Sequence, residues 1–422
     1  MSRNNNKLRR GVSIVGAGMS QFGRFNDLIG RDLLFQSFSD LIASVDKGLD
    51  VKDIQSMYIG NFSTEMFEGQ GHIGSIMADW LGLIPRPATR VENACASGGS
   101  AIREGINAVA SGLYDIVLVG GVEKMTSLST EETTDVLAMA ADVLYEVPAG
   151  FTFPAIYAAI AVAYLDKYKV SAEQLFEVSI KNHRNGSLNP RAQFNFTIAD
   201  MMERRVSRMV PSPISRPWNN EKDFLNDLSV NPWVSWPLRL FDCAPITDGS
   251  ACVLLVANEL CGAFTDYPVR VIGTGQASGP QLNTATDLTS LSAAKFASLE
   301  AYAMAGIGPE KIHLAEVHDC FSIAEIVATE DLGFFKQGYG IQAVEDGRTS
   351  LQGDKPINTS GGLKAKGHPV GASGVAQVVE LYLQLRGQAG LRQVANPNLE
   401  FGLAHNVGAA GGTGVVHILQ RE

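Results

Sequence analysis

The same short phrase occurs twice in this 422-residue sequence, as VSIVGAG at residues 12–18 and as VRVIGTG at residues 269–275. Each copy is an apolar run closed by glycines, a pattern typical of a buried strand that ends in a turn. Apolar runs alternate with helical patterns after each copy, which indicates layered α/β structure. The echo therefore predicts an internal duplication, and it restricts the chain to folds built from two α/β halves of similar plan.

The remaining apolar runs give each half a series of predicted strands. We expect further strands in the first half at residues 56–60, 88–92, 115–121 and 251–257, and in the second half at residues 313–321, 399–408 and 413–420. Between two of them, Ile102, Ile106, Val109 and Ala110 repeat at helical spacing and stop before Gly112. This spacing predicts a helix directly after the third strand.

The segment between the two series fits neither half. We place the first half at residues 1–125 and 241–265, an inserted loop domain at residues 126–240, and the second half at residues 266–422. The insertion contains the apolar run AIYAAIAVAYL at residues 155–165, which we interpret as a buried helix or the wall of a pocket. A long insertion of this kind often carries substrate contacts.

Composition excludes several classes of function. Apolar residues make up 45% of the chain and charged residues 18%, so the chain can bury a large core. The net charge of −10 argues against a nucleic-acid partner and against a polybasic membrane anchor. The longest apolar run is too short to span a bilayer, and no signal-length apolar run follows the basic N-terminus, so we expect a cytoplasmic protein.

The five cysteines fall into two groups. Cys243, Cys252 and Cys261 border the run CVLLVA, and we interpret them as small buried hydrophobic residues. No CxxC pair occurs in the sequence, so no metal site is expected, and a reducing cytoplasm argues against a disulfide framework. Cys95 and Cys320 stand in less ordinary surroundings.

Cys95 lies in VENACASGG, between a predicted strand and the start of a predicted helix. A helix N-terminus stabilises a thiolate, and Gly98 and Gly99 would let a substrate approach closely. This arrangement is like a nucleophile elbow, in which a sharp turn between a strand and a helix exposes the reactive side chain. On this stretch alone, a buried structural cysteine is an equally good interpretation.

Two further stretches carry titratable residues outside predicted helices. His368, in KAKGHPVGASG, precedes Pro369, which keeps it out of helical geometry and suits it to acid/base chemistry or to pairing with a thiol. Taken alone, a loop histidine that caps another group is the favoured interpretation. His318, Asp319 and Cys320, in EVHDCF, end a predicted strand, where α/β folds place their chemistry. The alternative is that these are ordinary polar surface residues. A metal site is not supported, because no further ligands follow at a spacing typical of metal-binding motifs.

Together, these stretches resemble the thiolase family over nearly the whole chain. The order of ENACASGG, an inserted loop domain, HDCF, GHPVGASG and a glycine-rich C-terminal segment is similar to that of thiolases. The phrase KNHRNGSLNPRAQF at residues 181–194 resembles the loop domain of the sterol-carrier-protein-2-type branch. The C-terminal segment HNVGAAGGTG has no cysteine, unlike the CxGGG of many thiolases, and the HDCF branch uses the cysteine at the position of Cys320 instead.

The resemblance implies a thiolase fold, in which two βαβαβαββ halves form a five-layered α/β/α/β/α core with a loop-domain insertion. It also implies that Cys95 carries the acyl group, that Cys320 moves protons and that His368 activates Cys95. The enolate oxygen would be held by His318 and His368, and the tetrahedral oxyanion by the amide of Cys95 and an amide at or near Gly411. Coenzyme A is then a co-substrate, and no covalently bound cofactor is expected.

The implied activity is that of an acyltransferase which cleaves or forms a 3-oxoacyl-CoA through an acyl-cysteine. Aromatic residues of the insertion, including Phe151, Phe153 and Tyr157, would accept a bulky or aromatic acyl group such as that of benzoylsuccinyl-CoA. The chain is acidic overall, so the CoA phosphates need local cations. We expect them from arginines of the insertion, namely Arg184, Arg204, Arg205 and Arg208.

Three alternatives stay open at this point. Another condensing enzyme, such as a ketoacyl synthase or a hydroxymethylglutaryl-CoA synthase, is disfavoured by the second thiol, Cys320. A non-catalytic acyl-CoA-binding member of the fold is disfavoured by intact Cys95, Cys320 and His368, and thiolase-like aldolases usually lack the nucleophilic cysteine. The family implies homodimers or homotetramers, and several members of this branch work with a small partner carrying an OB-fold and a zinc ribbon. No nucleic-acid or membrane partner is expected.

Overall fold

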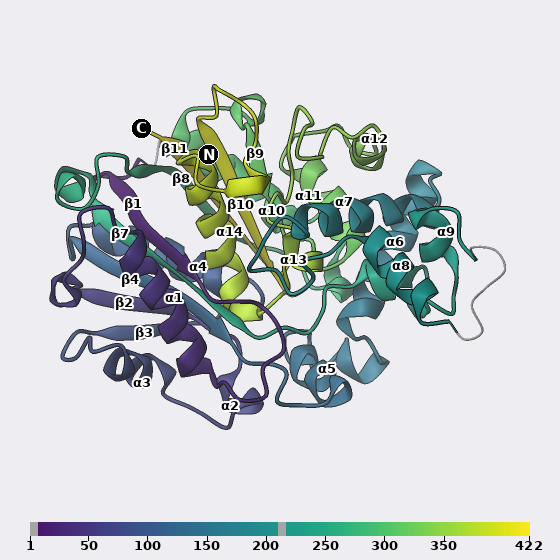
Figure 1. Cartoon of the computed structure of the whole chain (residues 1–422), viewed down its shortest axis with the longest axis horizontal. Helices are drawn as coiled ribbons and strands as arrows, with labels where there is room; N and C mark the ends of the chain where they lie inside the picture. Colours follow the sequence, from purple (N-terminus) through teal and green to yellow (C-terminus); the bar gives the residue numbers. More distant parts are fainter. Residues whose placement is uncertain (1–6, 210–216) are drawn as a thin grey trace.

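The computed structural model describes residues 7–209 and 217–422. The first six residues, on which part of the cytoplasmic prediction rests, lie outside the described residues, as do residues 210–216 of the expected insertion. Figure 1 shows a mixed α/β structure, with strands in the middle of the molecule and helices around and between them.

Five strands form the first part of the sheet: β1 Val12–Met19, β2 Ser56–Gly60, β3 Ala88–Val91, β4 Ile116–Glu123 and β7 Gly249–Ala257. Their order is β3-β2-β4-β7-β1. Strand β2 pairs in parallel with β3 and β4, whereas β7 runs antiparallel to both of its neighbours. All five lie where the apolar runs predicted strands, because four of them are buried along nearly their whole length.

Four strands form the second part: β8 Val269–Ser278, β9 Leu314–Glu316, β10 Phe401–Gly408 and β11 Thr413–Arg421. Their order is β9-β10-β11-β8, and Ile357 adds a parallel bridge to Ala315 on the free side of β9. With this bridge in the place of β3, the second series of strands repeats the order of the first. Val12 of β1 pairs antiparallel with Val271 of β8, so the two copies of the repeated phrase join the halves into one nine-stranded sheet.

Strand β9 is shorter than the strand predicted at residues 313–321. It ends early because the Val317 amide donates to the side chain of Asn358 (2.8 Å) instead of to a neighbouring strand. Residues 318–320 consequently lie in a loop that leads to helix α11, Ser322–Asp331. The titratable groups of this stretch are therefore carried by a loop and not by the strand itself.

Helices cover both outer faces of the sheet and also lie between its two parts. α4 (Ser97–Ala110) and α14 (Val370–Leu385) form the central layer, where they pack against strands of both parts. α1 (Gly30–Ser44) covers the outer face of the first part, and α10 (Ser292–Ala305) covers that of the second. Figure 1 shows α14 crossing the middle of the molecule. The order helix, sheet, helix, sheet, helix is the five-layered core that was expected.

Glycines permit a close approach of α4 and α14. A methyl group added to Gly98 would lie 2.8 Å from the carbonyl oxygen of Gly371, and one added to Gly99 would lie 3.0 Å from the Asn406 side chain. These glycines therefore make room for a neighbouring helix and strand, and not, as predicted, for a substrate. The packing fixes the N-terminal end of α4 and the residues that precede it.

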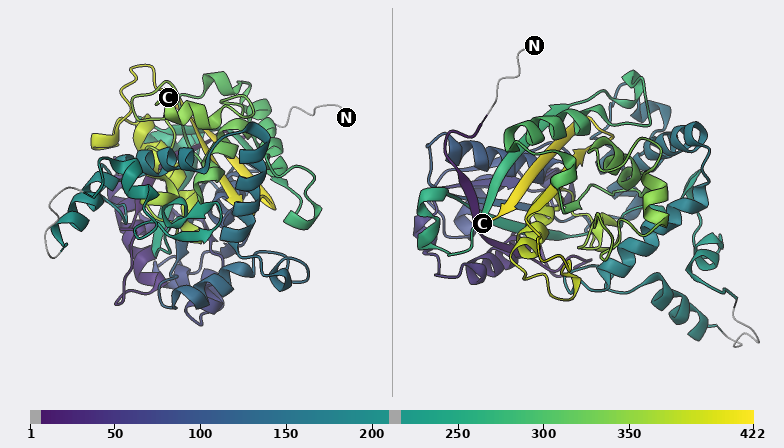
Figure 2. Two further views of the ribbon diagram at one scale, coloured as in Figure 1. Left: turned by 90° about the vertical axis from the view of Figure 1, so that its right-hand side faces the viewer. Right: turned by 90° about the horizontal axis from the view of Figure 1, so that it is seen from above.

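The chain between β4 and β7 forms a group of helices and one hairpin. These elements are α5 Thr130–Ala138, α6 Phe153–Tyr168, α7 Phe176–Gly186, α8 Ile198–Ser207, α9 Glu221–Asn226, β5 Trp233–Ser235 and β6 Leu238–Arg239. Figures 1 and 2 show helices α6 to α9 gathered at one end of the molecule. The apolar run predicted to be a buried helix lies in α6, where Tyr157, Ala161 and Tyr164 are buried and the helix packs against α11.

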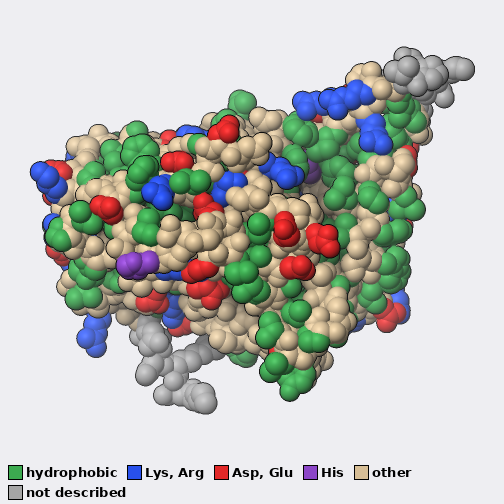
Figure 3. All heavy atoms as spheres, turned by 90° about the horizontal axis from the view of Figure 1, so that it is seen from below, with side chains coloured by type: hydrophobic (Ala, Val, Ile, Leu, Met, Phe, Trp, Pro, Cys, Tyr) green, Lys and Arg blue, Asp and Glu red, His purple; other side chains and the backbone are tan. Residues whose placement is uncertain are grey.

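The remaining helices connect these layers. They are α2 Thr64–Phe67, α3 Ile73–Trp80, α12 Gly340–Glu345 and α13 Gly362–Ala365. In the described ranges, no helix is both long and apolar enough to cross a membrane. Figure 3 shows acidic, basic and apolar side chains interspersed over one face of the molecule.

Candidate active site

Residues from both halves of the sheet and from the inserted helices line one cavity of about 540 Å³. Cys95 contributes from the first half, and Cys320 and His368 contribute from the second. Most of the remaining wall is apolar, and it includes Phe153 and Tyr157 of α6. Three of the four predicted catalytic side chains, which are distant in the sequence, therefore line one space.

Cys95 lies in a tight turn between β3 and α4. Ala94 adopts a left-handed conformation (φ 50°), which is strained for a residue with a side chain. The Asn93 amide donates to the Ser97 hydroxyl (2.9 Å), and that hydroxyl donates to the Ala94 carbonyl (2.6 Å). The turn is thereby locked onto the first residue of α4, and it presents the cysteine from a rigid elbow.

The Cys95 side chain is half-buried, and its thiol lies beside backbone amides. Burial raises the pKa of Cys95 to about 12, and the Ala409 N–H and the amide of Cys95 itself, which donate to Sγ, oppose this effect. The thiol is therefore neutral in the resting site, although its position before a helix suggested a stabilised thiolate. The same two amides can stabilise an oxyanion that forms next to the sulfur.

Of the amides at or near Gly411, the one that lies beside Cys95 is that of Ala409, two residues earlier. The Gly411 N–H donates to the Gly408 carbonyl (3.3 Å), and Gly411 lines a different cavity. Ala409 lines the catalytic cavity, and its amide faces Cys95. Ala409 is also left-handed (φ 54°), so strained residues with side chains stand on both sides of the thiol.

One hydrogen bond fixes the tautomer of His368, which lies between α13 and α14. The Ser373 hydroxyl donates to the Pro369 carbonyl (2.9 Å), so it accepts from Nδ1–H of His368 (2.7 Å). Nε2 then carries a lone pair, and it has no hydrogen-bond partner among the described residues. Burial, and next the charge of Lys366, lower the pKa of His368 to about 3. The ring is therefore neutral and free to accept a proton.

His318 has the opposite tautomer because of Asn406 in β10. The Asn406 Oδ1 accepts from the Gly99 amide (3.1 Å), which orients the side-chain amide. Its Nδ2 then donates to the Cys95 carbonyl (3.0 Å) and to Nδ1 of His318 (3.1 Å). An amide nitrogen only donates, so Nε2 of His318 carries the proton, and this N–H has no partner in the described part of the chain. Burial lowers the pKa of His318 well below its usual value, so the ring is neutral.

The Cys95 thiol and the two imidazoles form one cluster. Their donor atoms lie within 4.8 Å of one another, and the rings meet edge to face with centroids 5.1 Å apart. Such a set can also hold a thiophilic metal ion, which the sequence did not predict because the three residues are far apart in the chain. The fixed tautomers suit acyl transfer, since they place a base and an N–H donor beside the nucleophile.

Cys320 lines the cavity two residues before the start of α11. Tyr157 stacks on Phe321 with ring centroids 4.6 Å apart, and its hydroxyl contacts Cys320 Sγ and donates to the Ala409 carbonyl (3.2 Å). Burial, and next the neighbouring Cys95 thiol, raise the pKa of Cys320 well above its usual value, and the hydrogen bond with Tyr157 opposes this. The second thiol is thus a protonated group in contact with a tyrosine hydroxyl.

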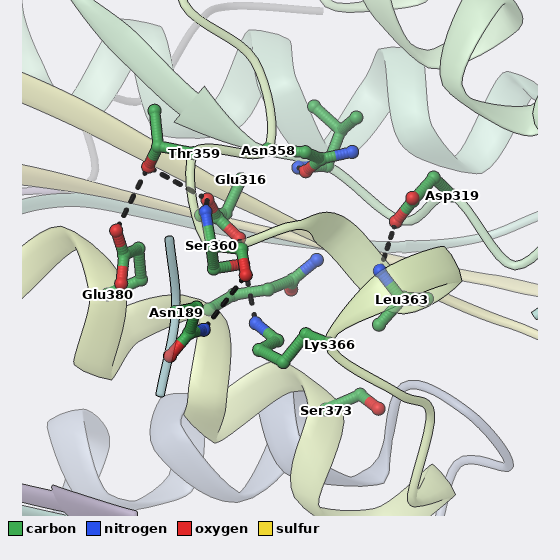
Figure 4. A network of polar contacts seen from close by, with 12 residues as sticks. Asn189, Glu316, Asp319, Asn358, Thr359, Ser360, Leu363, Lys366, Ser373 and Glu380 are labelled. Atoms are coloured by element: carbon green, nitrogen blue, oxygen red, sulfur yellow. Dashed lines mark hydrogen bonds and ion pairs between the residues drawn. The ribbon is translucent and has the colours of Figure 1, made fainter. Parts of the chain in front are cut away.

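A buried polar network holds the two loops that carry the imidazoles. Asp319 accepts from the Leu363 amide (2.7 Å) and from the Asn182 side chain (2.7 Å), so hydrogen bonds within the protein already occupy its carboxylate. Glu316, at the end of β9, accepts from the Ser360 amide (3.0 Å). Figure 4 shows the contact of Asp319 with the Leu363 amide, and it shows Glu316 beside Ser360. These contacts tie the loop after β9 to the segment before α14, which explains how groups from separate loops keep a fixed geometry.

The four arginines expected to bind CoA lie on the inserted helices or just after them, and they do not line the cavity. Arg184 pairs with Glu221 (3.3 Å), and Arg205 donates to the Ser229 carbonyl (3.4 Å). Arg208 follows α8 and is exposed.

Arg204 has the most direct link to the cavity. Its guanidinium lies over the ring of Phe196, 4.5 Å from the centroid, and Phe196 contacts Phe194 in the cavity wall. The structure therefore brings together the predicted thiols and histidines but leaves the arginines on the outside of the same region.

Sequence reasoning missed the contacts that Asn406 and Ala409 make with Cys95. Both lie in the HNVGAAGG segment, whose missing cysteine was the available signal, but their contacts depend on how β10 lies beside the Cys95 turn. Tyr157 was expected to shape the acyl pocket. Its contact with Cys320 depends on the packing of α6 against α11, which no local pattern encodes.

Cys243 also differs from its prediction. Cys252 and Cys261 are buried, as expected of small hydrophobic residues. Cys243 is only half-buried and lines the cavity, because it lies where the insertion returns toward β7 beside the substrate space.

On a duplicated α/β fold, a cysteine beside a free imidazole, an amide donor and a second thiol defines an enzyme that transfers acyl groups. Residues 12–209 match the family described as "Thiolase, N-terminal domain", and residues 275–421 match "Thiolase C-terminal domain-like". The chain belongs to the thiolase family, and it is an acyltransferase of that family.

Relatives of known name support this assignment. The acetyl-CoA acetyltransferase of Methanothermobacter thermautotrophicus is 44% identical over 98% of this chain and 100% of its own length. The benzoylsuccinyl-CoA thiolase subunit BbsB of Thauera aromatica is 31% identical over 90% of this chain and 91% of its own.

Solved structures share the fold. The Ltp2-ChsH2(DUF35) aldolase has a TM-score of 0.77 at 21% identity, over 97% of this chain and 98% of its own. Human mitochondrial 3-ketoacyl-CoA thiolase in complex with CoA has a TM-score of 0.70 at 18% identity, over 98% of this chain and 99% of its own.

Proposed function

We propose that this protein catalyses the CoA-dependent cleavage of a 3-oxoacyl-CoA, or the reverse Claisen condensation, through an acyl-Cys95 intermediate. The observation that carries the proposal is the position of two thiols, Cys95 and Cys320, in one cavity with the unpartnered nitrogen of His368. A reaction in which one thiol carries the acyl group and the other moves a proton needs both at one substrate. The second thiol also argues against a ketoacyl synthase.

In the thiolytic direction, Cys95 Sγ attacks the 3-oxo carbon while its proton passes to Nε2 of His368. The amides of Ala409 and Cys95 stabilise the tetrahedral oxyanion. The bond between C2 and C3 then breaks, the acyl group stays on Cys95, and the departing acyl-CoA is an enolate whose oxygen accepts from Nε2–H of His318. Each such donor typically lowers the barrier by about 3–4 kcal/mol.

The second stage returns the protons. Cys320 protonates the enolate at carbon, and the resulting Cys320 thiolate takes the proton of the incoming CoA thiol. The CoA thiolate attacks acyl-Cys95, and the Cys95 thiolate that leaves recovers its proton from His368. Every proton that is given up is taken back, so the site is unchanged after one turnover.

We further propose a bulky or aromatic acyl group, such as that of benzoylsuccinyl-CoA. The cavity of about 540 Å³ exceeds the needs of an acetyl group, and its wall includes the rings of Phe153, Phe194 and Phe321. An apolar wall favours apolar ligands because their contact removes surface from water. The name of the Thauera aromatica relative supports this choice, and that of the Methanothermobacter relative makes acetyl transfer the alternative to be tested.

The proposed enzyme is a cytoplasmic homodimer or homotetramer that works with a small partner subunit carrying an OB-fold and a zinc ribbon. The resemblance to the sterol-carrier-protein-2-type branch supports this proposal. The DUF35 component of the similar aldolase structure also supports it, because that enzyme is named as a complex of two parts.

We also propose that Arg204, Arg205 and Arg208 bind the CoA phosphates at the outside of the cavity. Arg204 of α8 contacts Phe196, and Phe196 contacts Phe194 in the cavity wall, so this arginine lies close to the cavity. Neutral substitutions at the three arginines should raise KM for CoA and leave kcat largely intact, because such contacts are equally strong in the ground and transition states. An unchanged KM would place the phosphates elsewhere.

A spectrophotometric screen of 3-oxoacyl-CoA esters with free CoA tests the activity, with and without a co-purified small partner. We expect CoA-dependent cleavage that is faster for aromatic or bulky esters than for acetoacetyl-CoA, and none with Cys95→Ala. Cleavage of acetoacetyl-CoA alone would assign acetyl transfer. Absence of cleavage of every ester, with the partner present, would contradict the proposed activity.

A further inference from the structure

One cation lines the catalytic cavity. Arg24, in the segment between β1 and α1, lines the same space as Cys95 and Cys320. Among the described residues of this wall, it is the only one with a full charge at neutral pH, and the wall has no carboxylate. A guanidinium in a largely apolar wall is a strong polar feature, and such isolated groups commonly set the orientation of a ligand.

The backbone at Arg24 is fixed, whereas its side chain is free. Gly23 and Asp248 exchange backbone hydrogen bonds (3.1 and 2.8 Å), and the Phe25 amide donates to the Asp248 carboxylate (3.1 Å). The side chain of Arg24 is exposed, and it has no hydrogen-bond, ion-pair or ring partner within the described residues.

The carboxylate that holds this segment, that of Asp248, already has other partners and is not available to Arg24. Asp248 is fully buried and pairs with Lys124 (2.9 Å). It also accepts from the amides of Met125 and Thr126 (2.8 Å each). Arg24 therefore keeps an unpaired charge at the cavity in a chain whose net charge is −10.

We propose that Arg24 binds a carboxylate on the acyl chain, so that the preferred substrates are dicarboxylic 3-oxoacyl-CoA esters. The inference rests on the proposed function. A guanidinium fork matches the two oxygens of a carboxylate. The phosphates of CoA offer similar chemistry, but the long uncharged pantetheine arm separates them from the thioester that must lie at Cys95. The wall then suits an acyl chain with an apolar middle and an anionic end.

A pair of substrates with the same chain length tests this assignment. 3-Oxoadipyl-CoA and 3-oxohexanoyl-CoA differ only in the terminal carboxylate. The wild type is expected to favour 3-oxoadipyl-CoA. Arg24→Gln should lower kcat/KM for that ester by about ten- to a hundredfold, the effect of losing a hydrogen bond to a charged group. It should leave 3-oxohexanoyl-CoA nearly unchanged, and Arg24→Lys, which keeps the charge, should restore part of the preference.

Arg9→Gln is the matched control, because it removes an exposed arginine before the other end of β1. Equal losses with both esters would mean that Arg24 contacts CoA, and no loss with either would mean that it only meets solvent. Both results overturn the proposal. Calorimetric binding of adipyl-CoA and hexanoyl-CoA to the Cys95→Ala protein gives the same comparison without turnover. A wild type that cleaves no ester would therefore contradict the proposed function alone, while the binding pair still decides the role of Arg24.

Discussion

The two thiols of the cavity have the same local position in opposite halves of the molecule, yet their surroundings differ. Cys95 and Cys320 each lie two residues before the first residue of a helix, α4 or α11. Cys95 lies beside the Ala409 amide and His368, whereas Cys320 contacts the Tyr157 hydroxyl. A helix N-terminus alone would favour the same chemistry at both. The difference teaches that neighbours from other elements, and not the helix start, distinguish the two thiols, and it supports the proposal that one carries the acyl group and the other moves protons.

The two imidazoles differ in the same way. His368 has a lone pair at its unpartnered nitrogen because Ser373 accepts from the other one, and His318 has a proton there because Asn406 donates to the other one. Both rings are neutral because burial lowers their pKa values. Neutral rings of opposite tautomer give the site a base and a donor without bringing two like charges together.

The largest expected effect comes from removing the proposed acyl carrier. Cys95→Ala should lower kcat by at least about 10⁴-fold, because the step that forms the covalent intermediate is lost. After incubation with an acyl-CoA, mass spectrometry should find the acyl group on the Cys95 peptide of the wild type and on no peptide of the variant. Acyl mass on the Cys320 peptide instead would reverse the two roles.

Removing the second thiol should separate the two half-reactions. Cys320→Ala should still acylate Cys95 from a simple acyl-CoA but lose turnover by about 10²–10⁴-fold, the usual range for a general acid or base. Cys243→Ala is the matched control, because it removes a third thiol from the same cavity wall and should keep turnover near that of the wild type. Full activity in Cys320→Ala would place the acid/base group elsewhere and remove the contrast between the thiols.

Much of the fold could be predicted because buried strands need continuous apolar sequence. The repeated phrase marked β1 and β8, which the structure joins at the centre of the sheet. Cys95, Cys320 and His368 could be singled out because a thiol before a helix and a histidine before a proline are unusual local patterns. Resemblance, and not spacing, supplied their proposed roles.

The rest could not be predicted because it depends on contacts between distant segments. Asn406 reaches Cys95 and His318 only because β10 lies between the first turn of α4 and the loop after β9. Tyr157 reaches Cys320 only because α6 packs on α11. Neither residue has a local pattern that distinguishes it from an ordinary polar or aromatic residue.

Asn406→Asp tests the tautomer of His318 with almost no change in size. A carboxylate in this place accepts only, so the proton of His318 should move to Nδ1 and leave Nε2 without a donor. We expect kcat to fall by about ten- to a hundredfold, as when the partner that orients a functional histidine is removed. KM should change little, because the donor is needed only once the enolate forms. Nitrogen-15 NMR of the histidine rings should show the exchanged tautomer.

Asn398→Asp provides the control for this change, because it makes the same substitution at an exposed position before β10. It should alter neither the tautomer nor kcat. A lower kcat in Asn406→Asp without a change of tautomer would mean that Asn406 acts by holding the Cys95 turn, and the contrast between the imidazoles would then need another cause.

The smallest expected effect comes from the hydroxyl that distinguishes the surroundings of Cys320. Tyr157→Phe removes one oxygen and keeps the ring that stacks on Phe321. Burial raises the pKa of Cys320, and the Tyr157 hydroxyl opposes this by turning from the Ala409 carbonyl to donate to the thiolate once it forms, so the variant should raise that pKa further. A hydrogen bond to a charged group contributes about 1.5–3 kcal/mol, which corresponds to roughly one to two pH units.

The direction of the pH shift follows from the proposed role of Cys320. In thiolysis, Cys320 starts each turnover as a thiol that protonates the enolate, so turnover falls as the pH rises through the pKa of Cys320. Tyr157→Phe should move this fall to higher pH, and it should lower turnover about tenfold near neutral pH because the thiolate formed in that step is less stable. Acylation of Cys95 from an acyl-CoA should keep its rate. An equal loss at every pH would make Tyr157 a packing residue, and the two thiols would then differ only through the groups around Cys95.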